Sequence, residues 1–216
     1  MSAPIRVFIG TDETQRVPCA VLKHSITSRT QALVEFHELD GHYADIPKQY
    51  TGFSFNRWAI PMLCGYEGRA IYLDADIVCL CDIAELFNLP MHNYTHLCRP
   101  VQTGGYYTSV MLMDCGRLQH WDFNNWAKLA DNRDTYKKTM WALPGGLSTA
   151  GIGALEPHWN SMDQSGRFDV PASVAKFFHY TVVPNQPWKK AGHPDEGVWR
   201  QAAIRATEAG AYHAVK

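Results

Sequence analysis

The sequence lacks any apolar run that could cross a membrane. A membrane-spanning helix needs roughly 20 consecutive apolar residues, and no stretch of the 216 residues approaches that length. The first residues also lack the charged segment and apolar core of a secretory signal. These two absences predict a soluble, cytoplasmic protein.

An excess of charge of one sign is also missing. Lys and Arg number 20 against 21 for Asp and Glu, without a long run of either sign. Nucleic-acid-binding surfaces and polybasic membrane anchors need clustered positive charge, so the composition predicts no nucleic-acid partner. The six cysteines have no metal-ligand spacing and are expected to be reduced, buried thiols.

What the sequence does have is an alternation of apolar, β-branched runs with segments of helical periodicity. With 46% hydrophobic residues in 216, we expect one domain over residues 1–216. The alternation predicts an α/β fold with a mostly parallel central sheet between helices. Strands are expected over 5–10, 33–39, 69–80, 95–99, 109–113, 153–156 and 176–180, helices over 17–28, 55–63, 83–87, 117–130 and 196–209, and a long functional loop over 40–53.

Two carboxylates interrupt the most apolar predicted strand. Side chains at i and i+2 of an extended segment point the same way, so Asp74 and Asp76 are expected on one side of the backbone. Parallel α/β sheets bind ligands at the carboxyl ends of their strands. Carboxylate oxygens suit Mg²⁺ or Mn²⁺, whose other positions are often filled by water and substrate phosphates. The pair therefore predicts a metal and diphosphate site.

A purely structural role explains the same pair. One aspartate could cap the following helix, the other could be a solvated strand end, and Asp-x-Asp arises by chance in many proteins. Placement favours the functional interpretation, because acids that end a hydrophobic strand carry a desolvation cost that a structural role does not explain.

Longer motifs resemble glycosyltransferase family 8, the retaining family that includes glycogenin and bacterial lipopolysaccharide galactosyl- and glucosyltransferases. The central match is Tyr72-Leu73-Asp74-Ala75-Asp76-Ile77-Val78 followed by Asp82-Ile83-Ala84-Glu85-Leu86. Further matches in the family's order are Val7 to Asp12, Arg57, Val110-Met111-Leu112, Trp159-Asn160, His179-Tyr180 and Pro187-Trp188. The resemblance implies a GT-A, Rossmann-like fold with a mixed, mostly parallel central sheet. It also implies a Mn²⁺-dependent transfer of a hexose from a UDP-sugar.

The resemblance also implies roles for individual residues. Asp74, Asp76 and His179 are expected to hold the metal, with Mn²⁺ preferred over Mg²⁺ because imidazole nitrogen suits it better. Asp74, Asp76 and Arg57 form the expected catalytic set. The residues expected to bind the nucleotide-sugar donor are Gly10, Thr11, Asp12, Arg57, Ala75, Gln186, Trp188 and Lys189. Without the resemblance, His179 would be interpreted as a buried strand-end histidine bonded to a backbone carbonyl.

Three departures from the family's pattern affect the donor and acceptor sites. Tyr107-Thr108-Ser109 stands where the family has Asn-Ser-Gly, and Gln186 replaces a lysine that contacts the diphosphate. The family's Asp-Gln pair near the reacting carbon has no counterpart in residues 137–148. The sequence therefore leaves the acceptor open between a glycan, a lipid-linked sugar and a protein.

Two other functions remain open from the residues. A nucleotidyltransferase acting on sugar nucleotides also pairs aspartates around a metal, although it would need a stronger Gly-rich phosphate loop than residues 10–16 offer. A non-catalytic module that binds a sugar nucleotide or a glycan would keep the metal site without turnover.

Overall fold

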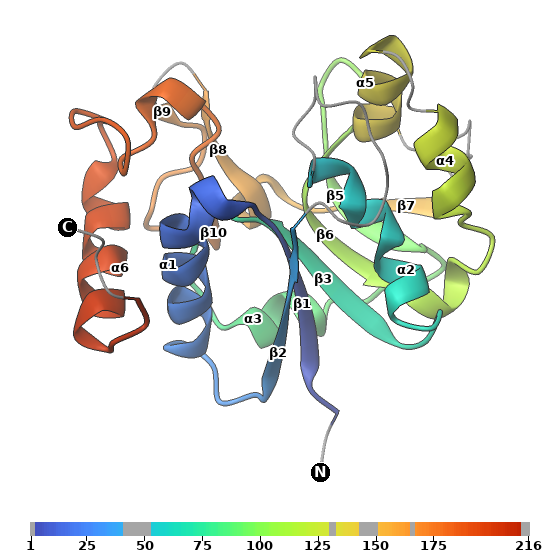
Figure 1. The fold of residues 1–216 in the computed structure, drawn as a ribbon, viewed down its shortest axis with the longest axis horizontal. Helices are drawn as coiled ribbons and strands as arrows, with labels where there is room; N and C mark the ends of the chain where they lie inside the picture. Colours follow the sequence, from blue (N-terminus) through green and yellow to red (C-terminus); the bar gives the residue numbers. More distant parts are fainter. Residues whose placement is uncertain (1–2, 41–52, 130–132, 143–150, 165–166, 213–216) are drawn as a thin grey trace.

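A computed structural model of the protein describes residues 3–40, 53–129, 133–142, 151–164 and 167–212. Most of the predicted functional loop over 40–53 lies outside the described residues. The described chain forms two sheets with helices packed around them (Figure 1). The strands are β1 Ile5–Gly10, β2 Val34–Leu39, β3 Arg69–Asp74, β4 Ile77–Cys79, β5 His96–Pro100, β6 Tyr106–Asp114, β7 Ile152–Ala154, β8 Ser161–Gln164, β9 Arg167–Phe168 and β10 Phe177–His179.

The larger sheet has six strands in the order β2-β1-β3-β6-β5-β7. Neighbours β2 and β1, β1 and β3, and β5 and β7 run parallel, whereas β6 is antiparallel to both β3 and β5. The predicted mixed, mostly parallel sheet is therefore present. The α-helices are α1 Arg16–Thr27, α2 Ile60–Leu63, α3 Ile83–Phe87, α4 Phe123–Leu129, α5 Arg133–Ala142 and α6 Glu196–Glu208.

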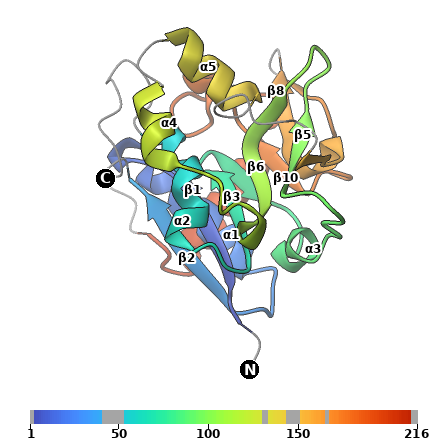
Figure 2. The same ribbon diagram turned by 90° about the vertical axis from the view of Figure 1, so that its right-hand side faces the viewer.

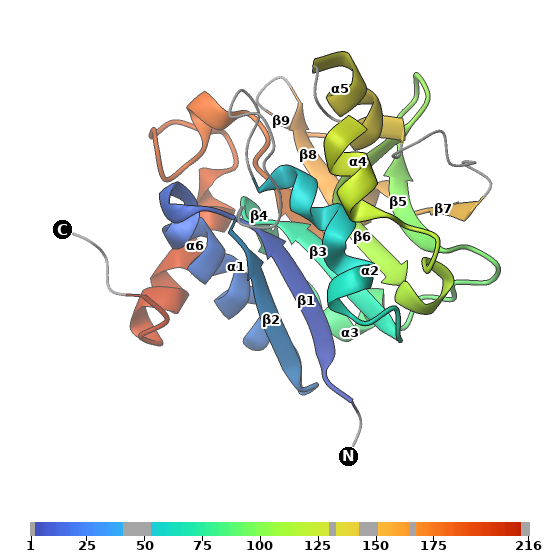
Figure 3. The same ribbon diagram turned by 45° about the vertical axis from the view of Figure 1, so that its right-hand side comes forward.

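Each face of the larger sheet has its own core, because successive strand residues point to opposite faces. Phe8 and Tyr72 pack with Trp58, α4 and α5 on one face. Val7 and Ile71 pack with α1 and α3 on the other. Figures 2 and 3 show α4 and α5 separated from α3 by β3, β5 and β6. Both faces are thus buried, as the continuous apolar runs predicted.

The smaller sheet was not predicted. Its order is β4-β10-β8-β9, and α6 packs beside α1 over it (Figure 1). The predicted single strand over 69–80 is wrong, because the chain turns at Ala75 and Asp76 and leaves the large sheet. Residues 77–79 then pair with β10 instead. Apolar content cannot distinguish one long buried strand from two short ones.

Other boundaries differ in a similar way. The helix predicted over 55–63 is a 3-10 turn, Ser54–Ala59, that continues into the short α2. The helix predicted over 117–130 begins only at Phe123. The α5 helix was not predicted. By contrast, Asp82 caps α3 as expected, since its carboxylate accepts from the backbone N–H of Ala84 at 2.8 Å.

Candidate functional site

Gly10, at the end of β1, lies beside the acidic turn Asp74-Ala75-Asp76 at one end of the large sheet. Gly10, the last residue of β1, is in register with Asp74, the last residue of β3. The backbone N–H of Ala75 donates to the carbonyl of Gly10 at 3.1 Å. Parallel pairing of β1 with β3 therefore brings the two predicted segments to the same sheet edge, as the sequence indicated.

Three predicted metal ligands converge at this edge. One ligand atom from each of Asp74, Asp76 and His179 lies within 4.8 Å of the others. His179 Nε2 is 3.1 Å from Asp76 Oδ1 and 3.8 Å from Asp74 Oδ2. Asp76 reaches this position from the turn after β3, so the extended i, i+2 geometry expected from the sequence does not apply.

The chemistry of these three candidate ligands suits a divalent cation. Oxygen and imidazole ligands suit Mn²⁺ in particular. Asp76 Oδ1 is buried and has no aligned hydrogen bond from any residue that the structure describes, although His179 Nε2 lies close to it. A buried, unpaired carboxylate oxygen is costly, and a bound cation would satisfy it.

Arg57 is buried beside this cluster, and each of its three guanidinium nitrogens donates a hydrogen bond. Its Nε donates to the carbonyl of Ser54 at 2.7 Å, and its Nη1 donates to Thr108 Oγ1 at 2.9 Å. Its Nη2 donates to Asp74 Oδ1 at 3.0 Å. In the described structure the guanidinium therefore holds Asp74 in place and also borders the cavity in front of it.

Electrostatics couple the acids and the imidazole. Burial raises the pKa of Asp74 and outweighs the opposite effect of Arg57. Burial lowers the pKa of His179, but the nearby Asp76 and Asp74 carboxylates outweigh that effect, so its pKa is raised. Of the two carboxylates only Asp74 contacts the Arg57 guanidinium, so the cluster favours an additional positive charge between the acids.

Tyr72 is a site residue that sequence reasoning did not single out. Its hydroxyl donates to Asp74 Oδ1, and its ring lies 4.4 Å from the guanidinium carbon of Arg57. A Cβ on Gly10 would collide with that hydroxyl and lie 3.1 Å from the tyrosine Cζ. Glycine is therefore needed at position 10 for close approach. The i, i+2 spacing of Tyr72 and Asp74 on one strand was the available signal.

The other residues predicted to bind the nucleotide-sugar donor differ in their distance from the acid cluster. Thr11 is buried, and Asp12 Oδ1 accepts from the N–H of Thr14 at 2.9 Å and caps a 3-10 turn. Gln186 is buried and its amide donates to Asp76 Oδ2 at 2.9 Å. Trp188 packs against Trp199, their ring centres 5.3 Å apart. Gln186 therefore contacts a metal-ligand candidate, whereas Trp188 takes part in packing.

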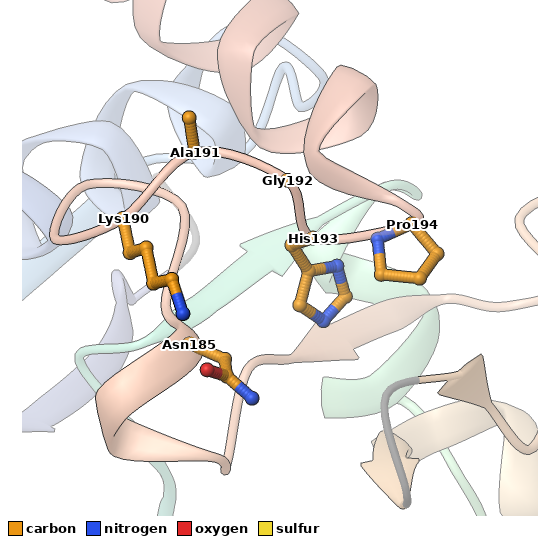
Figure 4. Close-up of a pocket in the computed structure, with 6 residues that line it drawn as sticks. All are labelled: Asn185, Lys190, Ala191, Gly192, His193 and Pro194. Carbon is orange, nitrogen blue, oxygen red and sulfur yellow. The ribbon is translucent and has the colours of Figure 1, made fainter.

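Lys189 is exposed on the segment that follows Trp188. The next residue, Lys190, borders a cavity of about 230 Å³ with Asn185 and His193 (Figure 4). None of the three metal-ligand candidates lines that cavity.

A separate cavity of about 260 Å³ opens on the acid cluster. Arg57, Asp74 and His179 line one part of it, and the start of β6, residues 106–109, lines another. Tyrosine, threonine and serine side chains offer an apolar ring face together with hydroxyl groups, which is the chemistry a sugar requires. The cavity next to the candidate metal ligands therefore has a lining that could contact a sugar.

The chain is similar to several known proteins in sequence and in fold. Protein CDI of Arabidopsis thaliana is 25% identical over 215 residues, covering 86% of this chain and 80% of CDI. The glycosyltransferase GlyE of Streptococcus pneumoniae superposes with a TM-score of 0.71 at 18% identity, over 96% of this chain and 63% of GlyE. This chain thus spans less than two thirds of GlyE. The galactosyltransferase LgtC, solved with donor and acceptor sugar analogues, superposes with a TM-score of 0.62 at 14% identity over 98% of both chains.

The structural matches show a GT-A glycosyltransferase fold, as the sequence resemblance implied. The family described as "Glycosyl transferase family 8" matches residues 12–142, which is more than half of the chain. That stretch contains Arg57 and the acidic turn. The chain therefore belongs to glycosyltransferase family 8.

Proposed function

We propose that this glycosyltransferase moves a hexose from a UDP-sugar to an acceptor hydroxyl, with Mn²⁺ as its cation and with retention of anomeric configuration. The observation that carries the proposal is the cluster of Asp74, Asp76 and His179, whose ligand atoms lie within 4.8 Å of one another. The sugar-like lining of the adjoining cavity supports a carbohydrate donor. Glucose is the preferred hexose by family resemblance, with galactose next.

The two carboxylates and the imidazole would hold the cation, and a cation bound there supplies positive charge to a leaving diphosphate. The chain's own contribution is to fix these groups before the donor arrives. Arg57 and Tyr72 both donate to Asp74 Oδ1, so this carboxylate is oriented by two hydrogen bonds. Preorganised charge of this kind lowers the barrier without reorganisation during the reaction.

The nucleotide is assigned by the same proposal to Gly10, Thr11 and Asp12. The register of Gly10 with Asp74 supports this assignment, because it brings the end of β1 next to the acidic turn. Ala75 lies on the same turn, and its N–H is bonded to Gly10. Lys189, exposed between Trp188 and α6, is proposed as a positive partner for the diphosphate.

The test is donor turnover with and without Mn²⁺. Release of free nucleoside diphosphate from UDP-glucose or UDP-galactose is the expected result, and Asp76→Ala should abolish it while the fold stays intact. His179→Ala should weaken metal and donor binding together. Near-normal turnover of the Asp76→Ala protein across a Mn²⁺ titration would reject the assigned site. Pyrophosphate exchange would instead indicate a nucleotidyltransferase, and saturable binding without turnover would indicate a binding module.

A further inference from the structure

His179 has a second polar neighbour behind the acid cluster. One ring nitrogen, Nε2, faces the two aspartates, and the other, Nδ1, lies 3.2 Å from Asn160 Oδ1. Asn160 is completely buried and sits just before β8, which pairs with the strand that carries His179. Arg99 Nη1 donates to the backbone carbonyl of Asn160 at 2.6 Å. The asparagine is therefore held next to the imidazole by both the sheet and a side chain.

The Asn160 amide has a second side-chain partner opposite the imidazole. Its Nδ2 donates to Ser109 Oγ at 2.9 Å, which leaves Oδ1 to face the imidazole. An amide oxygen only accepts, so Asn160 favours the ring form with its proton on Nδ1, whereas the Asp76 carboxylate favours a proton on Nε2. A cation between Nε2 and the carboxylates needs the Nε2 lone pair, which is the form that Asn160 favours. The reversed amide would place the proton on Nε2, where it would block a metal ligand.

Ser109 supplies the hydroxyl that contacts the Asn160 amide nitrogen at 2.9 Å. Ser109 is buried and also lines the cavity in front of the cluster. The serine and the asparagine thus form one hydrogen-bonded chain, Ser109 to Asn160 to His179, that ends at the proposed metal.

We propose that Asn160, held by Ser109, is a positioning residue that accepts a hydrogen bond from Nδ1 of His179 and so favours the ring form whose Nε2 is available to a divalent cation. The inference rests on the proposed metal site. Partners of this kind behind a metal-ligating histidine fix ring orientation, and their loss typically weakens metal affinity about 10–100-fold.

The first experiment measures Mn²⁺ binding by calorimetry. Asn160→Leu, which has a similar size but no acceptor, should weaken Mn²⁺ binding about 10–100-fold. Asn160→Asp keeps an acceptor for Nδ1 and should rescue affinity to near that of the parent protein. Ser109→Ala should give an intermediate loss. Ser25→Ala, which removes a buried hydroxyl from α1, is the matched control and should leave affinity unchanged.

The second experiment separates this inference from the proposed function. In metal-free protein labelled with ¹⁵N-histidine, at a pH where the ring is neutral, the ring-nitrogen signals give the fraction of His179 that is protonated on Nδ1. This fraction should be smaller in Asn160→Leu than in the parent, because the leucine offers Nδ1 no acceptor. Where the leucine variant does not fold, Ser109→Ala should show a smaller change in the same direction. An equal fraction in variant and parent, or an Asn160→Leu protein that binds Mn²⁺ like the parent, would overturn the inference. A parent that differs from the variants in this fraction but binds no Mn²⁺ would instead overturn the proposed metal dependence.

Discussion

Gln186 donates its side-chain amide to Asp76 Oδ2 at 2.9 Å, and the same nitrogen donates to the carbonyl of Tyr180 at 2.8 Å. These contacts tie the segment after β10 to the acidic turn. Gln186 is uncharged, so its contact leaves the negative charge of Asp76 available to another partner. The second oxygen, Oδ1, has no aligned hydrogen bond from the described residues and lies 3.1 Å from His179 Nε2.

Replacing Gln186 should disturb the metal site before it disturbs the fold. In Gln186→Met, Asp76 loses the contact that fixes its orientation, and Mn²⁺ affinity measured by calorimetry should fall about tenfold or more. Gln201→Met changes an exposed glutamine on α6 and is the matched control. Equal Mn²⁺ affinity in the two variants would show that the Gln186 contact does not position Asp76.

Because Gly10 and Tyr72 are so close, substitutions at the two positions should have coupled effects on the free energy of unfolding. Gly10→Ala places a methyl group against the tyrosine hydroxyl, and overpacking of this kind costs about 1–3 kcal/mol of the free energy of unfolding. Tyr72→Phe removes the hydroxyl and a hydrogen bond to a charged group, which costs about 1.5–3 kcal/mol.

Tyr72→Phe removes the hydroxyl that the added methyl group at position 10 would meet. The double variant should therefore be more stable than the sum of the two single losses predicts. Urea unfolding of the four proteins measures this coupling. Strict additivity would mean that the backbone at position 10 moves away and that the contact with Tyr72 does not constrain it.

The sequence predicted those parts of the site that are contiguous in the chain. The acidic turn and the end of β1 are recognisable because each follows an apolar run, and parallel pairing then brings them together. The contacts behind the ligands could not be predicted in this way. Asn160 and Gln186 reach His179 and Asp76 from the smaller sheet and the segment after it. That sheet exists because the chain leaves the large sheet after Asp74, and neither composition nor periodicity marks such an exit.

The ion pair of Arg57 with Asp74 should be more important to stability than exposed pairs of the same type. Both side chains are largely buried, with exposed fractions of 4% and 21%. Arg57→Met leaves the Asp74 carboxylate without its main positive partner, and breaking a buried pair in this way costs about 3–5 kcal/mol.

Arg16→Met is the matched control, because the pair of Arg16 with Glu13 is exposed by 74% and 79%. Exposed pairs contribute about 0–1 kcal/mol, so this variant should unfold at nearly the same urea concentration as the parent. An equally small change in the free energy of unfolding for Arg57→Met would show that the buried ion pair does not stabilise the fold more than an exposed pair.

His96 should give the protein a pH-dependent stability that is unrelated to the metal site. Burial, with a smaller effect of His120, lowers the pKa of His96 to about 3. The unfolded chain has a histidine pKa of about 6.5, so between these values it binds a proton that the folded protein does not. Stability is therefore unaffected above about pH 7.5 and falls as the pH drops below about 6.5.

The size of this effect follows from the same two pKa values. Between about pH 7.5 and about pH 5, the His96 contribution should lower the free energy of unfolding by about 2 kcal/mol. His96→Phe keeps a ring edge-on to Trp121, whose centre lies 5.5 Å from that of the imidazole, but it cannot be protonated. Subtracting its urea-unfolding free energies from those of the parent at each pH cancels the other titrating groups. A difference that stays constant with pH would mean that His96 is protonated equally in both states and is therefore not buried as a neutral ring.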